Sequence, residues 1–348
     1  MNKKIKCQIF SILLILLISF SLGGCGCSKQ KNADNKNNNT SEQTISKDIN
    51  NLTGLKIDES KSNLRPVCVM TNNMKKAQPL SGVFDADIVY ECLNEGGITR
   101  IMSVFKDIES VKNIGSVRSA RPYYINLAKG LNGIYVHLGG SSPAYSLLKS
   151  GYIDEIDLIL GKYMWRDESR RKNLGLEHSA FTSGEKLSQG IAEKGFSKTL
   201  DNNYKYNPYF SDDSQVLNGN PAKKLTVKFS GYKSTIFNYD EKTQEYLVSQ
   251  FDKPQMDANK SIQNSKKNVI VLRAKTQNFE NTELLDINLL GSGEGYYMSQ
   301  GKIIDIIWNR ENENTSFSYK TKDGKDLNLL KGKFYICIVT PNTTVTAE

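Results

Sequence analysis

The sequence predicts an α+β fold of two domains, in which an N-terminal α/β domain is followed by a mostly-β C-terminal domain. Strand-like and helix-like runs alternate up to about residue 205, which is typical of an α/β core. From about residue 222, strand and turn patterns repeat with scarcely a helix signal. The 348 residues are enough for two ordinary domains. We therefore expect domains at 59–205 and 222–345, joined by a polar linker at 206–221.

The N-terminal domain should begin near Arg65 with a short buried strand. Two β-rich runs flank Gly96-Gly97 and predict a hairpin. Ser119 is a candidate N-cap for a helix that has Pro122 in its first turn. The expected strands are 67–70, 87–94, 98–105 and 134–138, and the expected helices are 121–130, 142–149 and 184–194.

The C-terminal domain should be built from short strands and hairpins. Alternating and fully apolar runs of β-branched and aromatic residues are separated by Gly, Asn and Asp turns. The expected strands are 224–229, 269–272, 296–298, 303–308, 317–319, 327–329 and, as the last strand, 334–339.

The first 24 residues are typical of a lipoprotein signal peptide. Three lysines precede the apolar run 9–22, which is too short to span a bilayer comfortably. Leu22-Gly23-Gly24-Cys25 then matches the box at which a bacterial lipoprotein is acylated on cysteine and cleaved. An ordinary secretory peptide or an N-terminal anchor helix is the alternative. We expect cleavage before Cys25, palmitate-type acylation of Cys25, and attachment to the extracytoplasmic face of the cell membrane.

A polar segment follows this cysteine. Residues 28–52 contain many asparagines and almost no apolar side chain before Ile45. A segment of this composition cannot bury a core. We therefore expect a disordered tether over residues 25–58.

The charge is spread thinly along the chain. The net charge is +9, yet no run of five basic residues occurs. A dedicated nucleic-acid binder would usually cluster its basic residues, so we expect no nucleic-acid partner.

The cysteines predict buried thiols more strongly than a framework of disulfides. Cys68, Cys92 and Cys337 each lie in an apolar, strand-like run, where cysteine serves as a small core residue. A disulfide between Cys68 and Cys92 stays open at this level. With no CxxC pair and only two histidines, we expect neither a metal nor a cofactor.

Several strings resemble a known family. They are Ala86–Glu91, Glu95–Arg100, Ile114–Pro122, Tyr135–Ser141, Trp165–Asp167 and Glu177–Ser179, with looser matches at 268–271 and 293–297. Together they resemble the YerB-like bacterial lipoproteins, whose two domains are domains of unknown function. The resemblance covers about residues 60–342. The chain departs from the pattern at Ser116, where a proline is common. The resemblance implies the architecture and a membrane location, and it implies no activity.

An arginine-rich segment is the strongest candidate binding site. Arg100, Arg118 and Arg121 lie beside glycines where regular structure ends or starts. Guanidinium groups near a helix N-terminus suit a phosphate or a carboxylate. Alternatively these arginines pair with Asp85, Asp87, Glu91 and Glu95 and fix the hairpin. Ser119, Ser141 and Arg166 complete the expected ligand-binding set.

Two functions follow from these residues. We expect an anionic wall polymer or an envelope protein to bind the arginine-rich site. The alternative is a hydrolase of wall polymer or phosphoester with His137 or His178 as general base and a carboxylate such as Glu91 as orienter.

Overall fold

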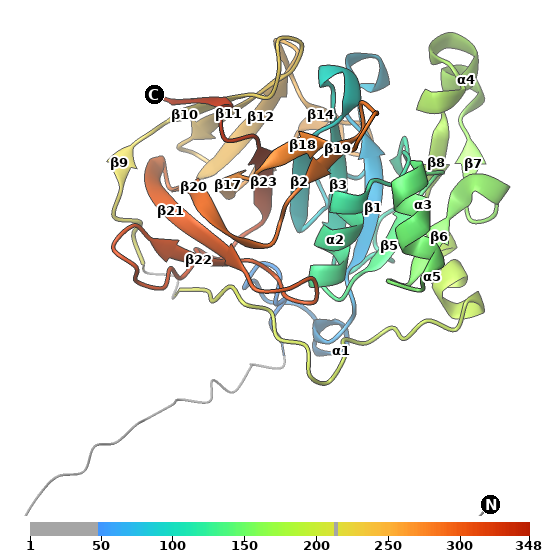
Figure 1. Ribbon diagram of the computed structural model, residues 1–348, viewed down its shortest axis with the longest axis horizontal. Helices are drawn as coiled ribbons and strands as arrows, with labels where there is room; N and C mark the ends of the chain where they lie inside the picture. Colours follow the sequence, from blue (N-terminus) through green and yellow to red (C-terminus); the bar gives the residue numbers. More distant parts are fainter. Residues whose placement is uncertain (1–47, 212–214) are drawn as a thin grey trace, which may run out of the picture. The chain divides into compact units, whose positions relative to one another are not determined.

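An 11-stranded mixed sheet forms the centre of the structure, a computed structural model that describes residues 48–211 and 215–348 (Figure 1). The predicted signal peptide, Cys25 and the residues of the predicted tether up to 47 lie outside the described residues. The strand order is β22-β21-β20-β17-β23-β2-β3-β1-β5-β6, with β9 paired to β21. These strands are β1 (Val67–Asn72), β2 (Ile88–Leu93), β3 (Thr99–Phe105), β5 (Ile134–His137), β6 (Glu155–Asp157), β9 (Asn220–Pro221), β17 (Asn268–Arg273), β20 (Gly291–Ser299), β21 (Lys302–Arg310), β22 (Ser318–Thr321) and β23 (Phe334–Val339).

The strand directions define two edges of this sheet. Strands β1, β5 and β6 run parallel, as do β2, β23 and β17. Strand β3 lies antiparallel to both β1 and β2, so β1 and β2 point the same way. The carboxyl ends of β1, β2, β5 and β6 therefore meet at one edge, which we call the carboxyl edge. The amino ends of the same strands form the opposite, amino edge.

Among the described residues, five helices accompany the sheet. Helices α2 and α3 cover one face of it, and Tyr123, Tyr124 and Leu127 of α2 pack there against buried strand residues (Figure 1). Successive strand residues alternate between faces, so the same strands also supply the core on the other face. The helices are α1 (Glu59–Ser62), α2 (Pro122–Gly130), α3 (Ser142–Lys149), α4 (Glu168–Leu174) and α5 (Gly184–Glu193), with one-turn helices η1 (Lys75–Ala77), η2 (Glu95–Gly97), η3 (Leu158–Leu160) and η4 (Leu176–His178).

A second sheet of six strands covers the other face together with α5. Phe237 and Val248 of this sheet share a core with Val69, Val89 and Ile101 of the central sheet. Its strands are β10 (Lys224–Lys228), β11 (Ser234–Asp240), β12 (Glu245–Gln250), β13 (Lys253–Pro254), β16 (Ser265–Lys266) and β24 (Thr344–Ala347). Three small sheets complete the fold: β4 (Ile114–Gly115), β7 (Trp165–Arg166) and β8 (Ala180–Thr182); β14 (Met256–Asp257) and β15 (Ile262–Gln263); β18 (Thr276–Asn278) and β19 (Leu285–Ile287).

The predicted fold class is confirmed: the N-terminal part is a mixed sheet with helices and the C-terminal part is mostly antiparallel β. The two parts nevertheless share one sheet. Ile88–Cys92 of β2 pair in parallel with Phe334–Ile338 of β23. All described residues also belong to one compact unit. The structure thus joins the expected domains 59–205 and 222–345 through backbone hydrogen bonds, across the expected linker 206–221.

The tether prediction is wrong for residues 48–58. Leu52 and Thr53 are only 1% and 0% exposed. Asn50 Nδ2 donates to Asp87 Oδ1 at 2.9 Å, and Asn51 Oδ1 accepts from Lys106 Nζ at 2.9 Å. One leucine and a few amides are enough to fix this segment on the folded part, because they cover charged side chains at the end of the β2–β3 pair. Composition alone could not show that these partners exist.

Several local predictions hold and others are corrected. The hairpin at Gly96-Gly97 forms, and Ser141 caps α3 by accepting from Ala144 N. Ser119 is not an N-cap, since α2 begins at Pro122 with Arg121 in the cap position and no side-chain cap bond. Strands β11 and β12 were not predicted, residues 327–329 form no strand, and β24 follows the strand expected to be last.

The prediction of buried thiols is confirmed, and Cys68 forms no disulfide with Cys92. Cys68, Cys92 and Cys337 are free and fully buried. Burial raises the pKa of all three thiols above the ordinary value. Within residues 48–211 and 215–348, no helix is both long and apolar enough to cross a membrane.

Candidate anion-binding site

The arginine-rich segment crosses the carboxyl edge of the central sheet. Leu138 N donates to Arg118 O at 3.0 Å, and Ala120 N donates to Gly139 O at 2.8 Å. These bonds lay residues 118–120 along the turn that follows β5. Arg100, the second residue of β3, sits opposite Asn72 at the end of β1. The structure therefore brings Arg100, Arg118 and Arg121 to one edge of the sheet.

Arg100 is a buried cation that makes no direct ion pair with any described carboxylate, although the charge of nearby Glu95 acts on it. Arg100 is only 6% exposed. Nη1 donates to Ser119 O at 2.8 Å, whereas Nε is buried and has no hydrogen-bond partner. Burial and the charges of Arg121 and Arg118 lower the pKa of Arg100 to about 10. The guanidinium therefore stays protonated at neutral pH, close to two further cations.

The other two arginines have carboxylates of their own. Arg121 Nε and Nη2 contact both oxygens of Glu95, the latter at 3.0 Å. Burial raises the pKa of Glu95, but the hydrogen bonds and charge of Arg121 outweigh it and hold the pKa below its usual value. Arg118 Nη1 donates to Glu177 O at 2.9 Å and to Glu177 Oε2 at 3.4 Å.

The other acidic residues predicted as possible partners of the arginines contact different groups. Asp85 pairs with Lys260, Asp87 accepts from Asn50 and from Lys106 N, and Glu91 pairs with Lys233. The hairpin acids therefore compensate one arginine of the three, and Arg100 is the one left with no carboxylate contact.

The remaining expected ligand-binding residues frame this cluster. Ser119 contributes its carbonyl to Arg100 and is half-buried, while Ser141 caps α3 at the next turn. Arg166 Nη1 donates to Leu176 O at 2.8 Å. Arg166 therefore holds the η4 turn that carries Glu177, the partner of Arg118.

His178 is a structural neighbour of the arginines. Asn72 Oδ1 accepts from Met74 N at 3.1 Å, so Asn72 Nδ2 faces His178 Nδ1 at 3.0 Å. The imidazole Nδ1 must then accept, which places the proton on Nε2, 3.2 Å from Glu177 Oε1. Burial lowers the pKa of His178, and Arg118 adds to this against the opposing charge of Glu177. Neither ring nitrogen is free to act as a base in this arrangement.

His137 is sealed in the core with 0% exposure. Its Nδ1 lies 2.8 Å from Gly139 O, and its Nε2 lies 3.1 Å from Glu155 Oε2. Both ring nitrogens therefore contact oxygen atoms. This ring holds the turn after β5 in place.

Glu91 lies on the opposite face of the sheet from the arginines. Its side chain is fully buried and accepts from Asn73, Thr99, Thr235, Gln250 and Tyr335. Lys233 Nζ is 3.3 Å from its Oε1. Sequence reasoning missed Lys233, Thr235, Gln250 and Tyr335, because nothing in a C-terminal strand pattern indicates a partner on β2.

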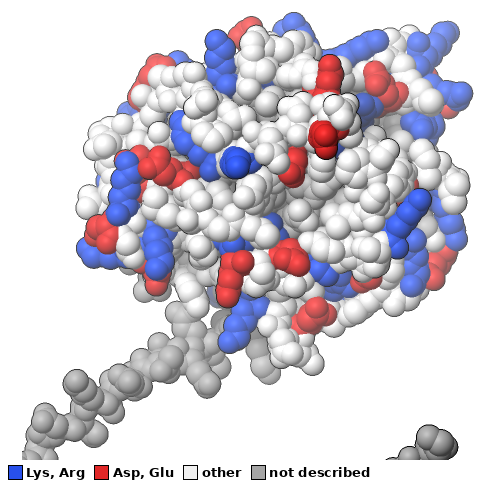
Figure 2. All heavy atoms as spheres, viewed as in Figure 1, with Lys and Arg blue, Asp and Glu red and all other residues white. Residues whose placement is uncertain are grey.

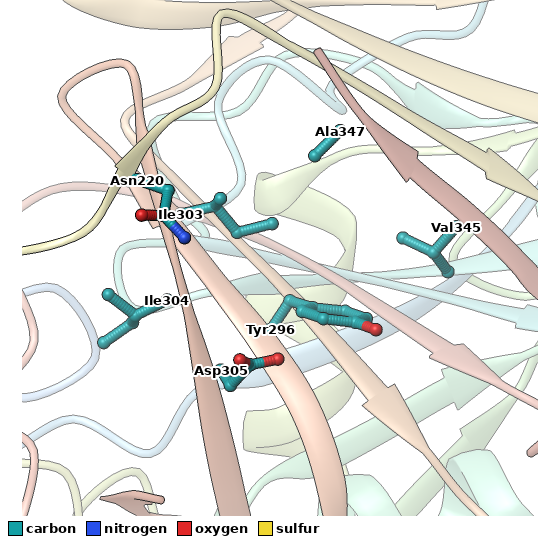
Figure 3. A pocket seen from close by; sticks show the side chains of 7 residues that line it. All are labelled: Asn220, Tyr296, Ile303, Ile304, Asp305, Val345 and Ala347. Atoms are coloured by element: carbon teal, nitrogen blue, oxygen red, sulfur yellow. The ribbon is translucent and has the colours of Figure 1, made fainter.

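A pocket of about 280 Å³ lies between β21 and β24. Tyr296, Ile303 and Val345 are among the residues that line it (Figure 3). None of the residues expected to form a site lines it. On the face shown in Figure 2, basic and acidic side chains are interspersed over the surface. Among the described residues, no group of three or more His, Cys, Asp and Glu side chains is placed to hold a metal ion.

The comparison with known families is decisive for identity. The model of the "Protein of unknown function (DUF3048) N-terminal domain" matches residues 52–197, and that of the C-terminal domain matches residues 225–336. The chain belongs to the DUF3048 family. This DUF3048 protein is 31% identical over 294 residues to the "Putative lipoprotein YerB" of Bacillus subtilis (strain 168), covering 83% of this chain and 85% of that protein.

A solved structure has a similar fold. The crystal structure of the YerB protein from Bacillus subtilis superimposes with a TM-score of 0.75 at 28% identity, covering 86% of this chain and 99% of that chain. The resemblance drawn from the sequence strings is thus confirmed. In this DUF3048 protein the strings Glu95–Arg100, Ile114–Pro122 and Glu177–Ser179 all contribute to the arginine cluster.

Proposed function

We propose that this protein is a membrane-anchored extracytoplasmic lipoprotein that binds an anionic ligand at Arg100, Arg118 and Arg121. The Leu22–Cys25 box and the name of the Bacillus subtilis relative support the lipid anchor. The observation that carries the binding proposal is Arg100, a buried guanidinium with a free Nε and no carboxylate contact.

A bound anion would compensate this charge. A phosphate or carboxylate oxygen can accept charge-assisted hydrogen bonds from a guanidinium, and these are roughly twice as strong as neutral ones. The N-terminus of α2 adjoins Arg121 and has no side-chain cap, so its positive end adds to the same field. Glu95 and Glu177 are already engaged by Arg121 and Arg118, which leaves Arg100 to attract an external group.

The ligand class follows from the location. An extracytoplasmic protein meets anionic wall polymers and acidic groups of envelope proteins, and phosphodiester or carboxylate groups are common to both. A hydrolase that uses His137 or His178 as base is less well supported, since both imidazoles are buried. Both nitrogens of His137 are hydrogen-bonded, and His178 faces Asn72 at Nδ1 and Glu177 at Nε2.

The experiment compares anion-dependent stabilisation of matched variants. The melting midpoint of the folded chain is measured in inorganic phosphate and in chloride at equal ionic strength, and then with an anionic wall polymer. We expect a phosphate-dependent rise for the wild type that is lost in Arg100→Met. Arg273→Met is the control, because the Arg273 guanidinium, like that of Arg100, donates to backbone carbonyl oxygen but lies outside the cluster. Equal rises in all three proteins would refute the proposal.

A further inference from the structure

A second recessed surface lies at the amino edge of the central sheet, away from the arginine cluster. It is a groove of about 740 Å³, within the range of roughly 300–1,000 Å³ typical of small-molecule sites. Arg65, Gly133 and Asp154, which line it, precede β1, β5 and β6. Its other wall is formed by residues of 201–207 and of the turn at 312–315. The groove thus spans the N-terminal segment, the linker and the C-terminal segment.

The groove carries little net charge. Three basic and two acidic residues line it. Arg65 Nη1 is 2.5 Å from Asp154 Oδ2, so this pair is internally compensated. Asn132 Nδ2 donates to Asp201 Oδ2 at 2.6 Å. A site for a polyanion would need a clear excess of basic side chains, which this groove does not have.

Amide side chains that are free to bind a ligand lie along one wall. Asn203 and Asn314 are exposed, and neither side-chain amide has an intramolecular hydrogen bond among the described residues. Asn312 Oδ1 accepts from Asn314 N, which leaves the Asn312 amino group free. Each amide presents donors and an acceptor in one plane. This pattern matches a ligand whose neighbouring groups both donate and accept, as the hydroxyls of a sugar do.

Two tyrosine rings are fixed in the same groove. Tyr152 OH donates to Asn126 Oδ1 at 3.0 Å, and Tyr204 OH donates to Gly130 O at 2.9 Å. Because both hydroxyls are anchored to α2, the half-buried rings are held in position. Lys129 Nζ lies 5.1 Å from the centre of the Tyr152 ring. A fixed aromatic face is what the apolar C–H face of a pyranose ring can pack against.

The two walls are tied together beneath the groove. Arg310 Nη2 donates to Asn126 O at 2.5 Å, and Arg310 Nε donates to Thr315 O at 2.7 Å. This buried side chain links α2 to the 312–315 turn. A groove with preformed walls loses less free energy on ordering when a ligand binds.

From these contacts we infer that the amide- and tyrosine-lined groove binds a neutral oligosaccharide. Weak net charge disfavours nucleic acid and phosphate polymers. Free amides at Asn203 and Asn314 provide paired donors and acceptors, and Asn312 adds a free amino group. The rings of Tyr152 and Tyr204 provide the apolar surface. The inference concerns a different edge of the sheet and does not depend on the arginine cluster.

The test uses a neutral tetrasaccharide of N-acetylglucosamine and a neutral tetrasaccharide of glucose as probes, with binding to the folded chain measured by calorimetric titration. The variant is the double substitution Asn203→Ala and Asn314→Ala, at exposed positions whose change should not unfold the chain. We expect at least one probe to bind, and the variant to bind it roughly 5- to 100-fold more weakly, from two lost hydrogen bonds.

The matched control is Asn218→Ala with Asn342→Ala, two exposed asparagines that do not line the groove. It should bind as the wild type does. Failure of both probes to bind at millimolar concentration would overturn the inference, as would equal affinity in the variant and the control. Preferential loss of inorganic polyphosphate binding in the variant would also overturn it, because the groove would then be an anion site.

Discussion

Glu91 and Lys233 form a completely buried ion pair, with 3.3 Å between Oε1 and Nζ and 0% exposure of both side chains. Glu91 is on β2 of the central sheet, and Lys233 directly precedes β11 of the second sheet. Lys233 Nζ also lies 4.6 Å from the centre of the Phe251 ring. The pair therefore connects the two sheets, and the N-terminal to the C-terminal segment.

Removing one member of this pair should destabilise the fold strongly. Glu91→Ala leaves the Lys233 ammonium buried without compensation, and such a change typically costs about 3–5 kcal/mol. The free energy of unfolding, measured by urea titration, should fall by this amount. The double variant Glu91→Leu with Lys233→Met should recover a large part of the loss, since no charge is then stranded. A double variant as unstable as Glu91→Ala would show that the pair itself is not responsible.

Stability should rise with pH on the alkaline side of neutrality. Burial lowers the pKa of Lys233 from 10.5 to about 8 in spite of Glu91. Between these two values the unfolded chain binds more protons than the folded chain, so the free energy of unfolding increases with pH. The contribution is at most about 3–4 kcal/mol, since one pKa unit corresponds to about 1.4 kcal/mol.

Lys233→Met provides the comparison for this pH dependence. The unfolding free energies of wild type and variant are measured from about pH 7 to about pH 9.5. Lys106 and Lys266 also have lowered pKa values and remain in the variant, so the difference between the curves is the quantity to follow. A difference that is independent of pH would contradict the lowered pKa of Lys233.

Substituting Arg121 and substituting Arg100 should lower the free energy of unfolding by different amounts. Arg121→Ala leaves the partly buried Glu95 without its bidentate partner, which should cost about 1–3 kcal/mol. Arg100→Met removes an uncompensated cation and loses a single bond to Ser119 O, so its free energy of unfolding should change by less. Thermal and urea unfolding of both variants test this order, and the reverse order would mean that Arg100 is structural.

The folded unit should need residues 48–55. A chain that begins at residue 56 lacks Leu52, which is almost fully buried, and leaves Asp87 and Lys106 without Asn50 and Asn51. We expect its free energy of unfolding to fall by at least about 2 kcal/mol, from the burial of one leucine alone. A chain that begins at residue 45 serves as control. Equal stability of the two chains would show that this packing is not needed.

Cys25 should carry the lipid anchor. Cys25→Ala removes the thiol at the end of the Leu22–Cys25 box and should release the protein from the membrane fraction or block its processing. Mass spectrometry of the native protein tests the same point, since an unmodified Cys25 would exclude acylation there.

Local patterns were sufficient for elements whose stability is local. Gly96-Gly97 between two β-rich runs predicts the β2–β3 hairpin, because only a tight turn lets neighbouring strands pair in this way. Ser141 predicts the start of α3, since its side chain satisfies a helix N–H three residues along the chain. The arginine cluster was also foreseen as a set, because Arg118 and Arg121 lie in one short segment and Arg100 begins the adjoining strand.

Long-range partners were decided by the tertiary structure alone. Pairing of β2 with β23 joins residues that are about 245 positions apart, and the hydrogen-bonding groups involved are the same at every position of both strands. The same limit applies to side chains: Arg121 and not Arg100 holds Glu95, and Lys233 holds Glu91. A sequence states which charges exist, but burial decides which of them must be paired. Only the packed sheet leaves Arg100 buried without a direct contact to any described carboxylate.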